Sequence, residues 1–377
     1  MNKPRILCIA TFPPPVHGAA VVSEQIRKSR VINESFDCDY VNIGTSHTIA
    51  EIGDGGLLLN FRKFGRFLRS FCKTFRLLLT QRYDLCYCAI TCHGSGFLKD
   101  APYVLLCKIF RRKVVIHQHN KGMAKDVDRP VYRWLLPLVY KNVKVILLSW
   151  LLYPDIEKVV RRENVLICPN GIKPAANSDF LRNPNKIPHI LFLSNLLIDK
   201  GVLVLLDALR MLKDKGYSFV CDFVGSETKD MDAACFAREV DERGLNGFAI
   251  YHGRKYGEEK AAYFKQADVF VFPSNNEAFP LVNLEAMSYK LPIVTTNVGG
   301  IPDVVTHGEN GFVNEPADVD SLASSLCTLL GDAPLRQKMG EAGYKKFKEK
   351  FTESCFENQL AAILKCIVGN ISERCGN

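Results

Sequence analysis

The sequence has no apolar run that approaches the ~18 residues which a helix needs to cross a bilayer. The stretch 143–153 is interrupted by Lys144, Ser149 and Trp150. The apolar part of the first segment, residues 6–12, is too short for a secretory signal and runs into three prolines, so it predicts a first strand. Short internal repeats and low-complexity tracts are also lacking, which argues against a repeat architecture.

Paired cysteine motifs are missing too. The 14 cysteines are scattered, and most sit inside apolar runs, which favours small buried side chains in a reducing cytoplasm over a disulfide framework. The only cluster is Cys86, Cys88 and Cys92 beside His93. No second CxxC-type pair accompanies it, so we expect no metal site there.

The charge is unevenly distributed along the 377 residues. Residues 1–180 contain 27 Lys and Arg against 14 Asp and Glu, a net charge of +13, whereas the remaining residues contain 22 against 26, or −4. We therefore expect the first half to meet an anionic partner, either a membrane surface or a charged acceptor. We expect no nucleic-acid partner.

Short β-rich runs alternate with helical patterns throughout, which predicts an α/β protein with parallel sheets covered by helices. The aperiodic stretch 172–188, with its Pro-Asn and Asn-Pro breaks, separates two such sets and predicts a linker. Three helices are expected at the end, near residues 320–330, 335–350 and 354–368. The expected strands lie near residues 5–11, 38–41, 85–90, 113–117, 144–148, 165–168, 190–193, 219–224, 248–251, 268–272 and 293–295.

The most informative stretch follows the expected strand 268–272. Pro280 fits the first turn of a helix, and the unpaired amides at a helix start form an anion site. Glu277 and Glu285 bracket that site. Because a carboxylate does not usefully face a phosphate, both should point at hydroxyl groups beside it. Hydroxyls on both sides of a phosphate describe a nucleotide sugar.

This stretch resembles the retaining family 4 glycosyltransferases of the GT-B fold. The resemblance rests on Glu277-x7-Glu285, preceded by Phe-Pro-Ser and followed by Val-Gly-Gly-Ile-Pro-Asp303, and extends to the glycine turn at 309–312. It implies two Rossmann-like doubly wound domains that face each other across a cleft. Residues 1–180 would bind the acceptor, 186–350 the nucleotide sugar, and the helix in 351–377 would cross back to the first domain.

The same resemblance implies roles for individual residues. Glu277 would hold the sugar hydroxyls and Glu285 the ribose, while Lys200 and the amides near Leu281 and Val282 would hold the diphosphate. Phe279 and Asn195 complete the expected donor set in this half. The co-substrate would be a nucleotide diphosphate sugar of the UDP or GDP type, and the chemistry would need no cofactor and no metal.

Two features depart from the family pattern. The family usually has Gly-Arg at Ser194-Asn195, so this chain replaces a bidentate cation by a neutral amide. Arg254 is a candidate to compensate for that loss. In the loop after the first strand only Gly18 remains of a region that often has two glycines, and it is expected to let the backbone approach the donor.

Two histidines follow the expected strand 113–117. Strand alternation sends His117 and His119 to the same side. A strand-end histidine is most often structural, and a His-x-His pair is also compatible with a metal site. The resemblance matches His119 better than His117 to a family histidine that hydrogen-bonds the donor sugar, so we expect a catalytic role for His119.

Residues 60–79 predict an amphipathic helix. At about 100° per residue, one face collects Phe64, Phe67, Leu68, Phe71, Phe75 and Leu78. The other face collects the basic residues Arg62, Arg66, Arg69, Lys73 and Arg76. We expect the apolar face to pack on the sheet and the basic face to contact lipid phosphates, placing the protein at the inner face of the plasma membrane.

The sequence therefore predicts a retaining glycosyltransferase that acts on a saccharide or lipid-linked saccharide in surface polysaccharide or lipopolysaccharide assembly. A sugar-nucleotide epimerase of the same fold and a non-catalytic saccharide-binding member remain alternatives. The Asn195 departure suggests the latter. A metal-using transferase is a further alternative, since DxD strings occur at 126–128, 230–232 and 318–320, although none directly follows a clear strand.

Overall fold

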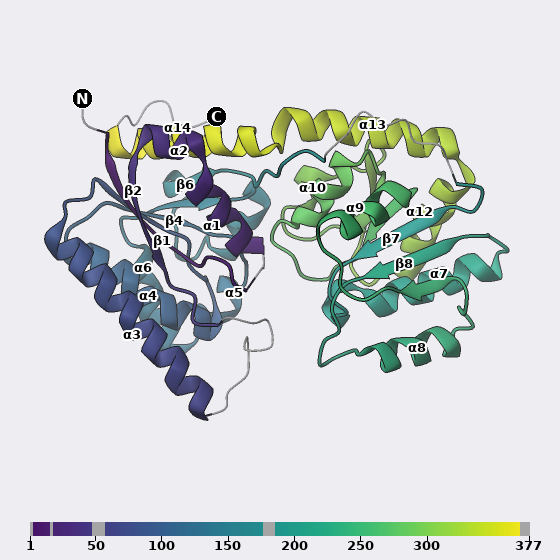
Figure 1. Ribbon diagram of the computed structural model, residues 1–377, viewed down its shortest axis with the longest axis horizontal. Coiled ribbons are helices and arrows are strands. Elements are labelled where there is room, and N and C mark those ends of the chain that lie inside the picture. Colours follow the sequence, from purple (N-terminus) through teal and green to yellow (C-terminus); the bar gives the residue numbers. More distant parts are fainter. Residues whose placement is uncertain (1–2, 16–17, 47–56, 176–184, 370–377) are drawn as a thin grey trace. The chain divides into compact units, whose positions relative to one another are not determined.

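The computed structural model describes residues 3–15, 18–46, 57–175 and 185–369. The chain divides into two compact units (Figure 1). The first comprises Met1–Asn170 together with Ser354–Asn377, and the second comprises Gly171–Glu353. Within the expected linker, residues 176–184 lie outside the described residues.

The first unit contains a parallel sheet of six strands in the order β2-β1-β3-β4-β5-β6. Its strands are β1 (Arg5–Ala10), β2 (Asp37–Asn42), β3 (Leu85–Cys88), β4 (Val114–His117), β5 (Lys144–Leu147) and β6 (Val165–Ile167). The helices of this unit are α1 (Gly18–Lys28), α2 (Arg30–Ser35), α3 (Leu57–Thr80), α4 (Gly94–Ile109), α5 (Met123–Asp126), α6 (Pro130–Tyr140) and α14 (Glu353–Gly369), with 3-10 turns at Trp150–Asp155 and Arg162–Asn164.

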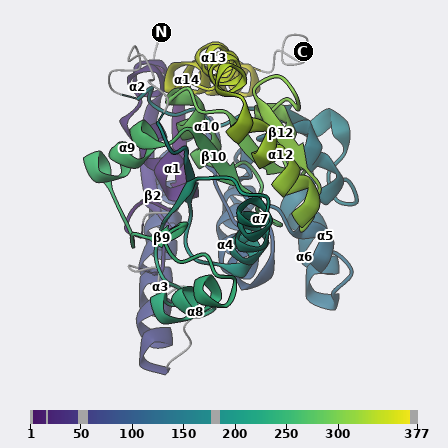
Figure 2. The same ribbon diagram turned by 90° about the vertical axis from the view of Figure 1, so that its right-hand side faces the viewer.

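Three of these helices form one layer. Right-handed crossovers between parallel strands put α3, α4 and α6 on the same face of the sheet. α4 packs against both neighbours and lies between them (Figure 2). The last helix belongs to this unit as well: Lys113 Nζ donates to Val368 O at 3.0 Å, and Gln359 Nε2 donates to Ile167 O at 3.0 Å.

The second unit contains a parallel sheet in the order β12-β11-β10-β7-β8-β9. Its strands are β7 (His189–Leu193), β8 (Val220–Val224), β9 (Ala249–Tyr251), β10 (Val269–Phe272), β11 (Ile293–Thr296) and β12 (Gly311–Asn314). The helices are α7 (Val202–Asp214), α8 (Ala233–Glu242), α9 (Gly257–Gln266), α10 (Leu281–Ser288), α11 (Ile301–Val304), α12 (Val319–Gly331) and α13 (Ala333–Lys350), with a 3-10 turn at Ile198–Lys200.

The α/β prediction and its eleven strands are confirmed, and so are the three final helices. One strand was missed. The sequence indicated only a glycine turn at 309–312, but Gly311 begins β12 and pairs with Ile293 of β11. A Cβ on Gly311 would lie 2.1 Å from Ile293 O, so only glycine allows this close strand pairing. Because β12 begins at a glycine and contains no run of β-branched residues, its sequence does not show the usual pattern of a strand.

The strand order of the second unit has a switch point between β7 and β10. From there the chain runs outward in both directions. Loops that follow two such strands diverge at the carboxyl edge of the sheet and leave a crevice for ligands. The loop after β7 contains Asn195 and Lys200, and the loop after β10 contains Glu277.

Candidate functional site

The loops after β7 and β10 are fastened to each other. Asn275 N and Ser274 Oγ both donate to Asp199 O, at 2.8 and 3.2 Å. Gly201 has φ +80°, and a Cβ there would lie 2.0 Å from Pro273 O. The two loops are therefore in backbone contact, which fixes Lys200 beside the segment that contains Glu277.

Glu277 forms an ion pair with Lys200, through its Oε1 and the lysine Nζ. Both side chains are about four-fifths buried, with 19% and 21% of their surface exposed. Lys200 Nζ also lies 3.4 Å from Asn276 O and 6.0 Å from the centre of the Phe272 ring. The cation predicted to neutralise a diphosphate therefore lies next to the carboxylate predicted to hold a sugar.

Glu285 also has a cationic partner. Its Oε1 accepts from Lys260 Nζ at 2.6 Å, and both side chains are about 30% exposed. Lys260 comes from α9. No sequence pattern predicts this pairing, because only tertiary packing brings α9 beside α10. Neither predicted carboxylate is turned into bulk water.

The backbone at Glu277 is held by a glycine from the next loop. Gly299, after β11, has φ +57°, and a Cβ there would lie 2.1 Å from Glu277 O. Its neighbour Gly300 donates its amide to Ala278 O at 2.7 Å. Gly299, the first glycine of the motif, thus allows a close approach that no larger residue permits.

Helix α10 starts directly after this segment. Pro280 is its N-cap rather than its first helical residue, and no side chain caps the helix within the described residues. The amides of Leu281 and Val282 have no carbonyl partner inside the helix, and both residues are partly exposed. This region is therefore suited to bind an anion. The helix start has a positive potential, the amides of Leu281 and Val282 are unpaired within the helix, and Lys200 lies nearby.

The remaining predicted donor residues lie in different surroundings. Phe279 is buried, with its ring 6.0 Å from that of Phe351, so its side chain is part of the core. Asn195 uses its Oδ1 to accept from Ser226 N at 3.3 Å. The Arg254 guanidinium stacks 4.4 Å above the Tyr256 ring. Donor contacts for Phe279 and Asn195, and the compensating role of Arg254, stay predictions.

The predicted histidines belong to the first unit. The rings of His117 and His119 are 4.1 Å apart, on one side of the chain as alternation predicts. His117 is fully buried, its Nδ1 is 2.7 Å from the Tyr87 hydroxyl, and burial holds the pKa of this imidazole well below its usual range. His117 is therefore a neutral core residue. His119 is partly exposed, and its catalytic role stays a prediction.

Gly18 is the first residue of α1 and is exposed. A Cβ at this position would meet no described atom within 4 Å. Crowding within the unit therefore does not account for a glycine here, and its donor contact stays a prediction.

The cysteine cluster is an internal feature of the first unit. Cys86, Cys88 and Cys92 are all buried, and burial raises the pKa of the Cys92 thiol. Among the described residues, no group of three or more His, Cys, Asp and Glu side chains is arranged to hold a metal ion.

The structure corrects the expected orientation of α3. Only Phe67, Phe71 and Leu78 of the apolar set turn inward: the rings of Phe67 and Phe71 lie 5.6 and 5.7 Å from Tyr103 of α4, and Leu78 is buried. Phe64, Leu68 and Phe75 are exposed instead. The prediction that all six pack on the sheet was wrong, because a single neighbouring helix covers a narrower arc than the apolar stripe.

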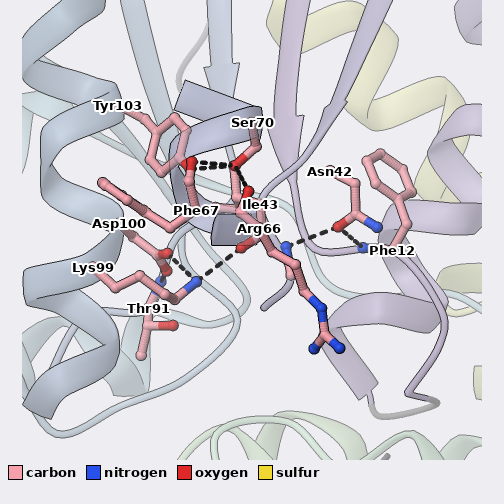
Figure 3. A network of polar contacts seen from close by, with 11 residues as sticks. Phe12, Asn42, Ile43, Arg66, Phe67, Ser70, Thr91, Lys99, Asp100 and Tyr103 are labelled. Carbon is pink, nitrogen blue, oxygen red and sulfur yellow. Dashed lines mark hydrogen bonds and ion pairs between the residues drawn. The ribbon is translucent and has the colours of Figure 1, made fainter. Parts of the chain in front are cut away.

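Polar contacts fix this orientation (Figure 3). Ser70 Oγ lies 2.5 Å from the Tyr103 hydroxyl and donates to Arg66 O at 3.1 Å. Arg66 Nη1 donates to Thr45 O at 2.5 Å. Lys73 Nζ donates to Tyr40 O at 3.0 Å. Two of the five predicted membrane-contact cations therefore help to anchor α3. Arg62, Arg69 and Arg76 are exposed.

In the described part of the chain, no helix is both long and apolar enough to span a bilayer.

Comparisons with known proteins agree with this picture. Residues 175–346 match the family described as "Glycosyl transferases group 1". The capsular polysaccharide biosynthesis glycosyltransferase CapM of Staphylococcus aureus is 29% identical over 173 residues, which are 46% of this chain and 44% of CapM. The chain thus spans less than half the length of that relative.

Two solved structures share the fold over nearly the whole chain. Sucrose-phosphate synthase from Thermosynechococcus elongatus gives a TM-score of 0.76 at 19% identity, covering 98% of this chain and 100% of the other. HepE of Anabaena, in complex with UDP, gives 0.73 at 18%, covering 96% and 100%. The predicted GT-B fold with two Rossmann-like domains is confirmed, as is the resemblance to glycosyltransferases.

Proposed function

Because residues 175–346 match the group 1 glycosyltransferase family, we propose that the protein is a retaining glycosyltransferase. It moves a sugar from a nucleotide diphosphate sugar to a hydroxyl of a saccharide or lipid-linked saccharide. The observation that carries the proposal is the pair of carboxylates, Glu277 and Glu285, around the start of α10, each held by a lysine. The UDP complex of HepE and the capsular role of CapM support a UDP-type donor and a surface polysaccharide product.

The chemistry follows from charge. The bond between the sugar C1 and the diphosphate oxygen breaks, and negative charge builds on the diphosphate. Lys200 and the amides of Leu281 and Val282 stabilise that charge, and removing one such group typically costs about 10²–10³ in turnover. Glu277 accepts hydrogen bonds from the sugar hydroxyls, and Glu285 from the ribose.

The anomeric configuration at C1 is retained because the acceptor oxygen attacks the same face of the sugar from which the diphosphate departs. A new bond forms between C1 and the acceptor oxygen, and the acceptor proton passes to the departing phosphate oxygen. This route needs no protein nucleophile. It needs no metal either, because protein cations and helix amides carry the leaving-group charge.

The test combines binding with turnover. Thermal shift against UDP, GDP and ADP sugars identifies the donor, since a ligand that binds only the folded state raises the Tm. Nucleotide release with a saccharide acceptor measures transfer, and NMR of the product anomer tests retention. Activity should survive chelation by EDTA.

Matched variants sharpen the test. Lys200→Met and Glu277→Gln should abolish most turnover. Lys290→Met should leave it unchanged, because Lys290 is as buried as Lys200 but pairs with Glu341, away from these loops. Product formed without any acceptor would indicate an epimerase instead. Donor binding without turnover would indicate a non-catalytic member, which the amide at Asn195 makes the relevant second candidate.

A further inference from the structure

The outer surface of the α3–α4–α6 layer is apolar, where such helices usually present charges to water. On α3, Phe61 is 67% exposed, Phe64 60% and Leu79 66%. Leu68 and Phe75 lie on the same stripe and are also exposed. At 100° per residue this stripe lies between the inward face and the basic face.

The stripe continues onto α4. Leu98 and Ile109 are exposed, Ile109 by 75%, and Pro102 and Leu105 between them are partly exposed. These four positions follow helical spacing, so the outward line of α4 is apolar along its whole length. The ring of Phe75 on α3 lies 5.7 Å from that of Phe110, just after α4, which joins the two stripes.

The stripe reaches α6 as well. Val131, Trp134 and Leu138 are spaced by three and four residues on the outward side of this helix, and Trp134 is 72% exposed. We define the exposed apolar residues of α3, α4 and α6 as the apolar layer. Contiguous exposed patches of this kind mark interaction surfaces.

Charge identifies what covers the apolar layer. α3 carries six basic residues and no acidic one, α6 carries Arg133 and no acidic residue, and the only acid in α4 is Asp100. Asp100 is buried, pairs with Lys99 and accepts from Thr91 N. An outward-facing apolar surface flanked by cations complements a bilayer with anionic headgroups.

A second copy of the chain fits this surface less well. A two-fold dimer would bring two copies of the same basic patch together, and juxtaposed like charges are costly. Exposed Trp, Phe and Leu are also the side chains found on the apolar face of helices that lie in the membrane interface. We propose that the apolar layer inserts into an anionic bilayer, with Arg62, Arg69 and Arg76 on lipid phosphates.

This surface differs from the one expected from the sequence. There only the basic face of α3 touched lipid, whereas here the aromatic side chains enter the bilayer and two further helices take part. The test uses vesicles without donor or acceptor, so its outcome is independent of the proposed transfer reaction.

Vesicle flotation of the full chain tests the proposal. Binding should be stronger to phosphatidylcholine vesicles that contain phosphatidylglycerol than to pure phosphatidylcholine, and should weaken with added NaCl. Arg62→Glu with Arg69→Glu should weaken binding about 25-fold or more, at about fivefold per cation lost. Phe61→Ser, Phe64→Ser and Trp134→Ser together should weaken it on the order of tenfold or more.

The second unit offers matched controls. Ile187→Ser with Ile250→Ser removes exposed apolar side chains elsewhere, and Lys215→Glu with Arg238→Glu reverses exposed charges elsewhere. Both double variants should bind vesicles like the wild type. If the triple variant fails to fold, Trp134→Ser alone tests the insertion, because that ring is mostly solvated.

Fluorescence reports insertion directly, since the chain has only two tryptophans. In a Trp150→Phe variant, Trp134 is the sole emitter, and its emission should shift to shorter wavelength on anionic vesicles and be quenched by brominated lipid. An unchanged spectrum would overturn the proposal. The proposal would also be overturned if the charge-reversed variant and the triple variant bound vesicles as strongly as the wild type. A third contrary result would be a chain that does not bind vesicles and instead forms a dimer that Trp134→Ser converts to a monomer.

Discussion

Replacing Gly299 by alanine should damage both the stability of the second unit and its chemistry. The residue has φ +57°, a conformation that costs an L side chain about 1–2 kcal/mol. In addition, the new Cβ would lie 2.1 Å from Glu277 O. Overpacking of this kind costs about 1–3 kcal/mol, so the total loss should be about 2–5 kcal/mol.

The clash also predicts a displacement. Real Cβ contacts are essentially never shorter than 3.0 Å, so the Glu277 carbonyl must retreat by at least 0.9 Å or the loop of Gly299 must move by that amount. A shift of about 1 Å in a positioning group typically costs about 10² in rate. We therefore expect turnover to fall about 100-fold in a chain that remains folded.

Urea unfolding and donor turnover measure the two effects, and two glycines separate their causes. Gly308 has φ +78° but no atom within 4 Å of its would-be Cβ, so Gly308→Ala should cost only the backbone term. Gly331 has neither constraint, and Gly331→Ala should be neutral or stabilising. If Gly299→Ala loses no more stability than Gly308→Ala, or retains full turnover, the close-approach explanation is wrong.

Three further predictions concern ionisable side chains. A double-mutant cycle of Lys200→Met and Glu277→Gln, measured by urea unfolding, should give a coupling free energy of about 1–3 kcal/mol. This value lies between those of exposed and fully buried ion pairs, because the two side chains are about four-fifths buried. If the losses of unfolding free energy in the two single variants simply add in the double variant, the ion pair is not formed. Glu285→Ala should weaken nucleotide binding, measured by calorimetry, about tenfold or more. Lys260→Met should weaken it less, because that lysine only orients Glu285. Equal affinities of the wild type and both variants would show that Glu285 is not part of the donor site. His117 has a lowered folded pKa, so the unfolded chain binds the extra proton and stability should fall as pH drops below about 6.5, by up to about 1.4 kcal/mol per pH unit. His117→Gln should lack this slope, and identical pH profiles would contradict the buried neutral imidazole.

The local patterns in the sequence were sufficient to predict much of this protein. Alternating β-rich and helical runs predicted the strands of both sheets except β12, and the spacing of Pro280, Glu277 and Glu285 predicted a helix start between two carboxylates. These features depend on local backbone preferences and on side-chain period, which neighbouring residues largely determine.

Tertiary structure decided the partners and the exposures. Lys260 meets Glu285, and Gly299 meets Glu277 O, only because separate loops and helices converge at the carboxyl edge of one sheet. Helical period placed the phenylalanines of α3 on one side but did not reveal how much of that arc α4 covers. Local sequence fixes the direction in which a side chain points from its own helix, whereas its contacts depend on elements that the chain brings there from elsewhere.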